Sequence, residues 1–293
     1  MKVAVIQLGY GDDEPVADRV VRAADLVRAQ RGHDLVVLPE LWPHGGFAYR
    51  QWSKRAETLD GPTAQAMSAA ARDAGVILHA GSIVEQAAIG ADAGPQGRGR
   101  WNTSLLFGSD GELLATYRKV HRFGFGEGEP QLLEAGTRIV TVDVPRPSTR
   151  TVSDASLELS TPHVNGAVTV PSDVVRLGLT TCYDLRFPEL YRRLLDEGAQ
   201  VVLVPAAWPA ARVEHWTLLG RARAIENQLF VVQANPAGTH ARHEMGGLSQ
   251  VIGPWGEVLA QAGTDEQVLS ADIDVDGLDG VRVHFPVLAD RRL

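Results

Sequence analysis

Short apolar runs alternate with amphipathic segments along most of the 293-residue chain. Residues 2–9 and 34–41 are rich in β-branched residues and bounded by Gly, Asp or Pro, a pattern that predicts two buried strands. Between them, apolar residues recur at helical spacing before Gly32, which predicts an amphipathic helix. Its apolar face comprises Val16, Val20, Ala23, Ala24 and Val27.

The same pattern predicts further helices at 62–73, 188–197 and 213–227. The first of these leads into the apolar run GVILHAGSIVEQ, and Ser-Asp-Gly then joins two strands as a hairpin-like turn. More strands are expected at 138–144, 174–182, 201–208, 229–235, 247–253 and 257–261. Helices that alternate with apolar strands indicate parallel βαβ units, and hairpins add antiparallel partners. We therefore expect an α/β protein with a mixed sheet, or a pair of sheets, and helices outside.

Two segments of the chain resemble each other: HDLVVLPELWP (33–43) and AQVVLVPAAWP (199–209). Each follows a predicted helix and ends in Pro, two variable positions, Trp and Pro. This similarity favours two related sheets, and chance similarity between two buried strands is the alternative.

Residues 146–172 are rich in Ser, Thr and Pro and lack helical periodicity. Strand-like sequence resumes on both sides, so we expect a surface loop inserted within one domain, near a sheet edge or at a subunit contact. The domain is expected to span residues 1–275. Residues 276–293 would form a C-terminal tail, with a subunit interface as a candidate place for it.

Composition excludes several classes of protein. Hydrophobic residues make up 44% of the chain and charged residues 22%, as in soluble globular proteins. The net charge of −8 argues against nucleic-acid and anionic-membrane partners. No apolar stretch approaches the roughly 18 residues of a membrane helix, and the N-terminal run does not resemble a signal peptide. The single cysteine excludes an internal disulfide, so we expect a cytoplasmic protein.

That single cysteine, Cys182, lies at the end of the predicted strand VVRLGLTTC. Tyr183, Asp184 and a helix with Pro188 near its start follow it. A strand-to-helix turn lies at the carboxyl edge of a sheet, where ligand sites gather and backbone N–H groups can stabilise an oxyanion. Cys182 is therefore a candidate nucleophile, and an inert buried thiol is the alternative.

A nucleophilic thiol needs a base, and none of the nine histidines can be chosen for this role from sequence. Glu40 follows an apolar strand, where burial would raise the pKa of its carboxyl toward that of a working base. Lys119 ends a strand and enters a Gly-rich loop, where a fixed ammonium would suit a developing oxyanion. Simple solvation is the alternative for both. The chain has no HExxH, CxxC or close His/Asp cluster, so we expect no metal.

Glu40 in LPEL, Lys119 in YRKVH and Cys182 in TTCYDLRFPEL together resemble the catalytic triad of the nitrilase superfamily of carbon–nitrogen hydrolases. The resemblance covers nearly the whole chain, including ARAIENQLFVVQANPAG (222–238) and GPWGEVLA (253–260). It implies a four-layer α-β-β-α sandwich with two mixed sheets, no cofactor, and subunits that abut as a homodimer or larger homo-oligomer. CYDLRFPELYR is most similar to the small-amidase branch, which includes omega-amidases, although the loop at 146–172 departs from its compact members.

The resemblance also implies a mechanism. Glu40 would take the thiol proton, Cys182 would attack an amide carbon, and Lys119 with the Tyr183 N–H would stabilise the oxyanion. Ammonia would leave, and water would hydrolyse the thioester. The expected substrate is a small aliphatic amide, for example an omega-amide of a 2-oxo acid. Nitriles or N-carbamoyl compounds are alternative substrates, and a catalytically silent binding scaffold is the non-enzyme alternative.

The family further implies a second glutamate after the lysine, and Glu127 and Glu129 are the candidates. Counting from Lys119 favours Glu127, whereas counting back from Ala135-Gly136 favours Glu129, which we expect. Tyr183, Trp208 and His215 are expected at the substrate pocket, although Trp208 and His215 could equally serve packing. Three arginines are weaker candidates for binding a substrate carboxylate: Arg221, Arg223 and Arg242.

Overall fold

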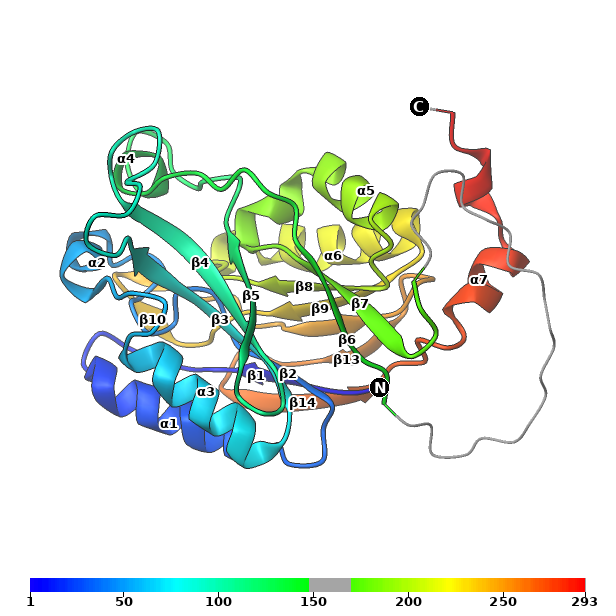
Figure 1. Ribbon diagram of the computed structural model, residues 1–293, viewed down its shortest axis with the longest axis horizontal. Coiled ribbons are helices and arrows are strands. Elements are labelled where there is room, and N and C mark those ends of the chain that lie inside the picture. The colour runs from blue at the N-terminus through cyan, green and yellow to red at the C-terminus, as the bar shows by residue number, and fades with distance from the viewer. Residues whose placement is uncertain (148–169, 293) are drawn as a thin grey trace.

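Two six-stranded mixed sheets pack face to face in the computed structural model, which describes residues 1–147 and 170–292 (Figure 1). The strand order is β14-β1-β2-β3-β4-β5 in the first sheet and β13-β12-β9-β8-β7-β6 in the second. Helices α1 and α3 cover the outer face of the first sheet, and α5 and α6 cover that of the second. The molecule is therefore the α-β-β-α sandwich that the sequence predicts.

The first sheet has a parallel centre, β1-β2-β3, and antiparallel strands on both sides of it. Its strands are β1 (Lys2–Gln7), β2 (Leu35–Val37), β3 (Ile77–Gln86), β4 (Arg100–Phe107), β5 (Leu113–Arg118) and β14 (Gln267–Asp272). Its covering helices are α1 (Val16–Arg28) and α3 (Pro62–Ala74).

The second sheet has the same plan, with β7-β8-β9 as the parallel centre. Its strands are β6 (Thr141–Pro145), β7 (Val174–Leu179), β8 (Val201–Pro205), β9 (Phe230–Ala234), β12 (Gln250–Ile252) and β13 (Val258–Gln261). Its helices are α5 (Pro188–Asp196) and α6 (Val213–Asn227). The remaining elements are α2 (Tyr49–Arg55), α4 (Glu129–Leu132), β10 (Thr239–His240), β11 (His243–Glu244) and α7 (Leu278–His284).

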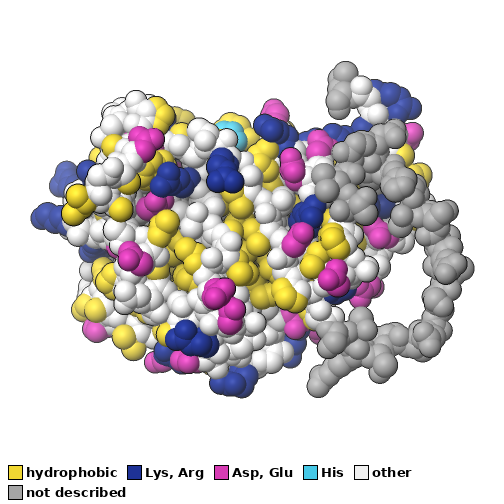
Figure 2. Space-filling model, in the orientation of Figure 1, with side chains coloured by type: hydrophobic (Ala, Val, Ile, Leu, Met, Phe, Trp, Pro, Cys, Tyr) yellow, Lys and Arg dark blue, Asp and Glu magenta, His cyan; other side chains and the backbone are white. Residues whose placement is uncertain are grey.

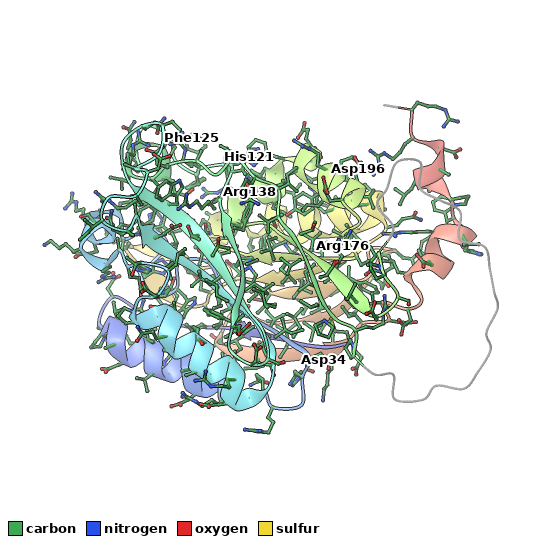
Figure 3. The ribbon with its side chains drawn as sticks, viewed as in Figure 1. Asp34, His121, Phe125, Arg138, Arg176 and Asp196 are labelled. Carbon is green, nitrogen blue, oxygen red and sulfur yellow. The ribbon has the colours of Figure 1, made fainter. Side chains whose placement is uncertain are left out.

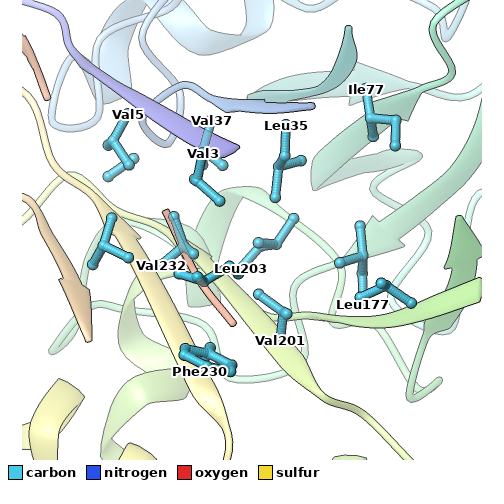
Figure 4. Packing of buried hydrophobic residues seen from close by; sticks show 14 of the residues in the cluster. Val3, Val5, Leu35, Val37, Ile77, Leu177, Val201, Leu203, Phe230 and Val232 are labelled. Carbon is cyan, nitrogen blue, oxygen red and sulfur yellow. The ribbon is translucent and has the colours of Figure 1, made fainter. Parts of the chain in front are cut away.

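The main core lies between the two sheets (Figure 4). Along β1, Val3 and Val5 face the opposite sheet, while Ala4 and Ile6 face the helices outside. Both faces of the central strands are therefore buried, which explains why these strands read as continuous apolar runs instead of alternating ones. Leu203 and Val232 fill the same layer from the second sheet.

The two similar sequence segments occupy equivalent places. The first contains β2, which lies between β1 and β3, and the second contains β8, which lies between β7 and β9. The turns after these strands touch each other, because the Glu40 N–H donates to the Ala206 carbonyl at 3.1 Å. The similarity therefore reflects two related halves of the sandwich whose central strands end at a common point.

Several predicted strands end earlier than their apolar runs. The run at 34–41 forms strand only over Leu35–Val37, since Pro39 has no N–H to donate and Leu41 adopts a left-handed φ of 45°. The runs at 174–182 and 201–208 likewise leave the sheet at Leu179 and Pro205. In each case the residues beyond the strand build a buried turn.

Strand β14 and helix α2 are not predicted by the hydrophobic pattern. β14 is a largely exposed edge strand that pairs antiparallel with β1 over its whole length. β5 is an edge strand of the first sheet, and β6 is an edge strand of the second. Both lie on the face seen in Figure 2, where hydrophobic side chains gather among charged ones.

Of the expected insert, residues 148–169 lie outside the described residues, and the described ends lead out of β6 and into β7. The C-terminal tail packs against the second sheet's helices: Gln228 Nε2 donates to the Phe285 carbonyl at 2.7 Å, and Arg291 pairs with Asp196. Within residues 1–147 and 170–292, no helix has the length and apolarity needed to cross a membrane.

Candidate active site

Cys182 opens a single 3₁₀ turn, Cys182–Arg186, between the end of β7 and the start of α5. Its φ of 47° is in the left-handed region, an uncommon and strained conformation for a residue with a side chain. The turn is fixed by the buried Asp184 carboxylate, which accepts from the Thr181 N–H at 2.9 Å. The sequence therefore positions the thiol at a rigid elbow at the end of a strand.

Asp184 also connects this elbow to the segment that carries Lys119. Its carboxylate accepts hydrogen bonds from the Tyr117 hydroxyl at 2.7 Å and from His121 Nδ1 at 2.7 Å. Figure 3 shows His121 and Phe125 on the connection between β5 and α4, along the upper edge of the molecule in this view. The Cys182 turn and the Lys119 turn are thus held together by one carboxylate.

Glu40 lies in the turn after β2 and is 3% exposed. Its Oε1 accepts from Lys119 Nζ at 2.7 Å and from Asn102 Nδ2 at 2.7 Å. Its Oε2 accepts from the Ala207 N–H at 2.8 Å. All of these partners are donors, so the carboxylate is hydrogen-bonded as an anion despite its burial.

Lys119 follows β5 and is 2% exposed. Its Nζ lies 2.7 Å from Glu40 and 3.0 Å from Glu129. Burial by itself would lower the pKa of the ammonium, but the carboxylates of Glu129 and Glu40 outweigh it and raise that pKa well above its usual range. Lys119 is therefore a fixed positive charge at the site.

The structure brings Glu129, and not Glu127, to the lysine. Glu129 is the first residue of α4 and is 3% exposed, whereas Glu127 lies exposed on the loop before it. The Phe123 N–H donates to Glu129 Oε2 at 2.5 Å. Burial raises the pKa of the Glu129 carboxyl, while the Lys119 ammonium acts in the opposite direction.

The thiol of Cys182 faces this cluster. Burial raises the pKa of the Cys182 thiol well above its usual range, and the negative charge of Glu40 adds to the effect, while Lys119 partly offsets it. The thiol is therefore protonated at neutral pH and needs a base for nucleophilic attack. The carboxylate of Glu40, whose charge acts on the thiol, is in place to provide one.

The thiol opens onto a small cavity. It is lined by Tyr183 and Trp208, together with Phe47, Phe123, Arg186, Ala207, Pro209 and Arg212. His215 does not line it: this residue lies on the exposed side of α6, with its Nδ1 3.3 Å from the Arg186 guanidinium. The structure thus places His215 outside the residues that line this cavity, in contact with one of them, Arg186.

Sequence reasoning missed three polar residues of the site: Asn102, Arg186 and Arg212. Arg186 stands within the motif CYDLRFPEL, but only the fold shows that its side chain turns toward the cavity. The arginines considered from sequence lie elsewhere. Arg223 is buried and donates to the Leu185 carbonyl, and Arg221 donates to the Gly256 carbonyl.

The site is not accompanied by a cluster of candidate metal ligands in the described part of the chain. Residues 1–147 and 170–292 contain no group of three or more His, Cys, Asp or Glu side chains that could hold a metal ion. The carboxylates of the cluster beside Cys182 instead accept hydrogen bonds from an ammonium and from N–H donors.

Curated relatives resemble the chain over its whole length. The 2-oxoglutaramate amidase of Paenarthrobacter nicotinovorans is 45% identical over 100% of this chain and 90% of its own. Omega-amidase NIT2 of Homo sapiens is 34% identical over 99% of this chain and 95% of its own.

Solved structures share the fold. Nit3 of Saccharomyces cerevisiae, a member of branch 10 of the nitrilase superfamily, has a TM-score of 0.77 at 29% identity, covering 100% of this chain and 97% of that one. A variant of the amidase from Nesterenkonia sp. AN1, with acrylamide added to its active-site cysteine, has a TM-score of 0.72 at 25% identity, covering 98% of each chain. The family model for carbon-nitrogen hydrolase matches residues 2–283, and this chain therefore belongs to the carbon–nitrogen hydrolase family.

Proposed function

We propose that this carbon–nitrogen hydrolase is an omega-amidase in which Cys182 is the nucleophile, Glu40 the general base and Lys119 the oxyanion-stabilising cation. One observation carries the proposal: the only cysteine of the chain faces a buried cluster of two carboxylates and one ammonium that is linked by hydrogen bonds. Such a cluster is costly to bury, and a packing role for Cys182 would not need it.

The reaction begins when Glu40 takes the proton of the Cys182 thiol and the sulfur attacks the amide carbon. The new C–S bond produces a tetrahedral intermediate, whose oxyanion is stabilised by the Lys119 ammonium and by the backbone N–H of Tyr183. Glu40 returns the proton to the amide nitrogen, the C–N bond breaks and ammonia leaves. Water then attacks the thioester with Glu40 as base, and cleavage of the C–S bond regenerates the thiol.

Glu129 has a supporting role in this proposal. It shares the Lys119 ammonium with Glu40 and fixes its direction, because Glu129 itself is held by the Phe123 N–H. Because two carboxylates hold the lysine side chain, its ammonium does not move away from the position of the oxyanion. Its charge is therefore already in place when the transition state forms.

The substrate that we propose is a small amide with a carboxylate at its other end. Arg186 and Arg212 both line the cavity. Burial lowers the pKa of Arg186, and the positive charge of Arg212 adds to this shift. A substrate carboxylate between the two guanidiniums would relieve their repulsion and accept charge-assisted hydrogen bonds. Trp208, whose ring lies 4.6 Å from the Arg186 guanidinium, and His215 would hold Arg186 in this position.

The relatives support the same substrate class, since two of them are named for 2-oxoglutaramate and for omega-amides. Ammonia release tests it directly, on 2-oxoglutaramate, an uncharged amide of equal length, a nitrile and an N-carbamoyl amino acid. We expect kcat/KM to favour 2-oxoglutaramate over the uncharged amide by at least about tenfold, the scale of one charge-assisted hydrogen bond. Higher kcat/KM on the nitrile or the carbamoyl compound would refute the substrate class.

Arg186→Met should remove this preference while leaving the uncharged amide's kcat/KM nearly unchanged. Arg221→Met is the matched control, because Arg221 lies outside the cavity and donates to a backbone carbonyl. An equal preference for the carboxylate in both variants would refute the role of Arg186. If no substrate in the panel releases ammonia, a catalytically silent scaffold becomes the better account.

We further propose that the enzyme is a cytoplasmic homodimer. A reduced thiol suits a reducing compartment.

The dimer is proposed from a hydrophobic patch that extends from α6 to the C-terminal tail. It consists of Leu218, Ile225, Trp255 and Phe285, each about half exposed or more, and a second copy of the chain would cover it. Light scattering should give twice the chain mass for the wild type and a monomer for Ile225→Glu. A monomeric wild type would refute the dimer.

A further inference from the structure

Asn102, on strand β4 next to the edge strand β5 of the first sheet, touches all three charged residues of the cluster. Its Nδ2 lies 2.7 Å from Glu40 Oε1 and 2.6 Å from Glu129 Oε1. Its backbone carbonyl accepts from the Lys119 N–H at 2.9 Å. The side chain is 2% exposed. The amide nitrogen must face the two carboxylates, because a carboxylate can only accept, and this fixes the orientation of the amide.

The charged groups around Asn102 do not neutralise one another. Two carboxylates share one ammonium, so the buried cluster has one negative charge in excess when both are ionised. Buried like charges lower their energy by binding a proton on one carboxyl. A proton on Glu40 would block the base, and a proton on Glu129 would turn one acceptor of Lys119 into a donor.

The amide of Asn102 supplies two N–H groups at the point where the excess charge lies. Lys119 Nζ and Asn102 Nδ2 bridge the same pair of carboxylates, Glu40 and Glu129. An asparagine side chain donates without adding a charge of its own, so it stabilises both carboxylates and does not compete with Lys119 for the oxyanion.

We infer that Asn102 is a positioning residue, which keeps Glu40 and Glu129 ionised and aligned around Lys119 so that Glu40 is free to accept the thiol proton. The inference rests on the proposed roles of Glu40 and Lys119. Asn102 does not touch the cavity that receives the substrate, and it acts through the two carboxylates.

This role has a pH signature. The titratable groups that face the two carboxylates are the Lys119 ammonium, the Cys182 thiol and the phenols of Tyr49 and Tyr10. Loss of the two N–H donors destabilises the ionised carboxylates and raises their pKa. The enzyme then becomes protonated at higher pH, so the acid limb of kcat/KM moves toward neutral pH.

The test compares Asn102→Leu with Thr103→Val, a neighbour on the same strand. Thr103 is also buried, and its hydroxyl donates to Glu85 at 2.6 Å, away from the cluster. Asn102→Leu removes two buried hydrogen bonds and Thr103→Val removes one, and each change keeps the number of side-chain heavy atoms. We expect Asn102→Leu to lower kcat by at least about a hundredfold with KM changed less than about threefold, and to shift the acid limb upward. Thr103→Val should keep kcat within about threefold and leave the acid limb in place.

Asn102→Asp is the second variant, which keeps the shape of the side chain if Asn102→Leu fails to fold. It replaces the donor by a third carboxyl group, so kcat should again fall at least about a hundredfold. The inference is overturned if Asn102→Leu matches Thr103→Val in kcat and acid limb, or if Asn102→Asp keeps kcat within threefold. Glu40→Gln in the same assay separates this outcome from failure of the proposed function: full activity in Glu40→Gln would refute the base itself, whatever Asn102 does.

Discussion

Glu129→Gln tests most sharply whether the Glu129 carboxylate positions the Lys119 ammonium or is merely a buried charge. The wild-type carboxylate accepts from two donors at Oε1, Lys119 Nζ and Asn102 Nδ2, and from the Phe123 N–H at Oε2. A glutamine has one oxygen. If the oxygen replaces Oε1, its NH₂ group meets the Phe123 N–H, and if it replaces Oε2, its NH₂ group meets Lys119 and Asn102. Either way a donor faces a donor, and Lys119 loses half of its neutralising charge.

The loss of one preorganised electrostatic group costs about 10²- to 10³-fold in kcat. We therefore predict that Glu129→Gln lowers kcat by at least about a hundredfold, measured by steady-state ammonia release, with a smaller change in KM. Glu127→Gln is the matched control, since Glu127 is exposed on the same loop, and it should change kcat by less than about tenfold. The opposite ranking would refute this reasoning and move the role to Glu127.

Two further predictions concern pH. Because burial raises the pKa of the Cys182 thiol well above its usual range, alkylation by iodoacetamide should accelerate from pH 7 to beyond pH 9, and a plateau below pH 8 would contradict this. Burial also lowers the pKa of His44, His79 and His240 to about 4. Between pH 6.5 and 4 the unfolded chain then binds more protons than the folded one. The free energy of unfolding should therefore decrease as the pH is lowered from 6.5 to 4, by roughly 3 kcal/mol per histidine. Denaturant titrations that give constant stability over this range would contradict the burial of neutral histidines.

Much of the fold follows from the hydrophobic pattern, because the central strands are buried on both faces and their helices are amphipathic. Helix α6 coincides with its predicted residues, 213–227. The pattern fails where burial is one-sided or weak: the edge strand Gln267–Asp272 is mostly exposed, and its pairing with β1 spans more than 260 positions of sequence. Such a strand is defined by its partner and not by its own composition.

The candidate site also contains residues that the sequence could predict and residues that it could not. Glu40, Lys119 and Cys182 could be identified because each lies at a strand end within a motif of the family. The choice between Glu127 and Glu129 needed the loop geometry, since they lie two residues apart where the loop enters α4, and only Glu129 is buried. Asn102 and Arg212 could not be identified, because an asparagine within a strand and an arginine before a helix have many ordinary uses. Their roles arise only from partners that are distant in sequence.

The central claim is that the only thiol of the chain is the nucleophile, and the kcat of Cys182→Ala for ammonia release tests it most directly. The substitution removes one sulfur atom from a rigid turn, so thermal unfolding should show a folded protein. We predict that kcat falls by at least about 10⁴-fold, as expected when a nucleophile is removed. A folded Cys182→Ala protein that retains more than a tenth of the wild-type kcat would contradict the account.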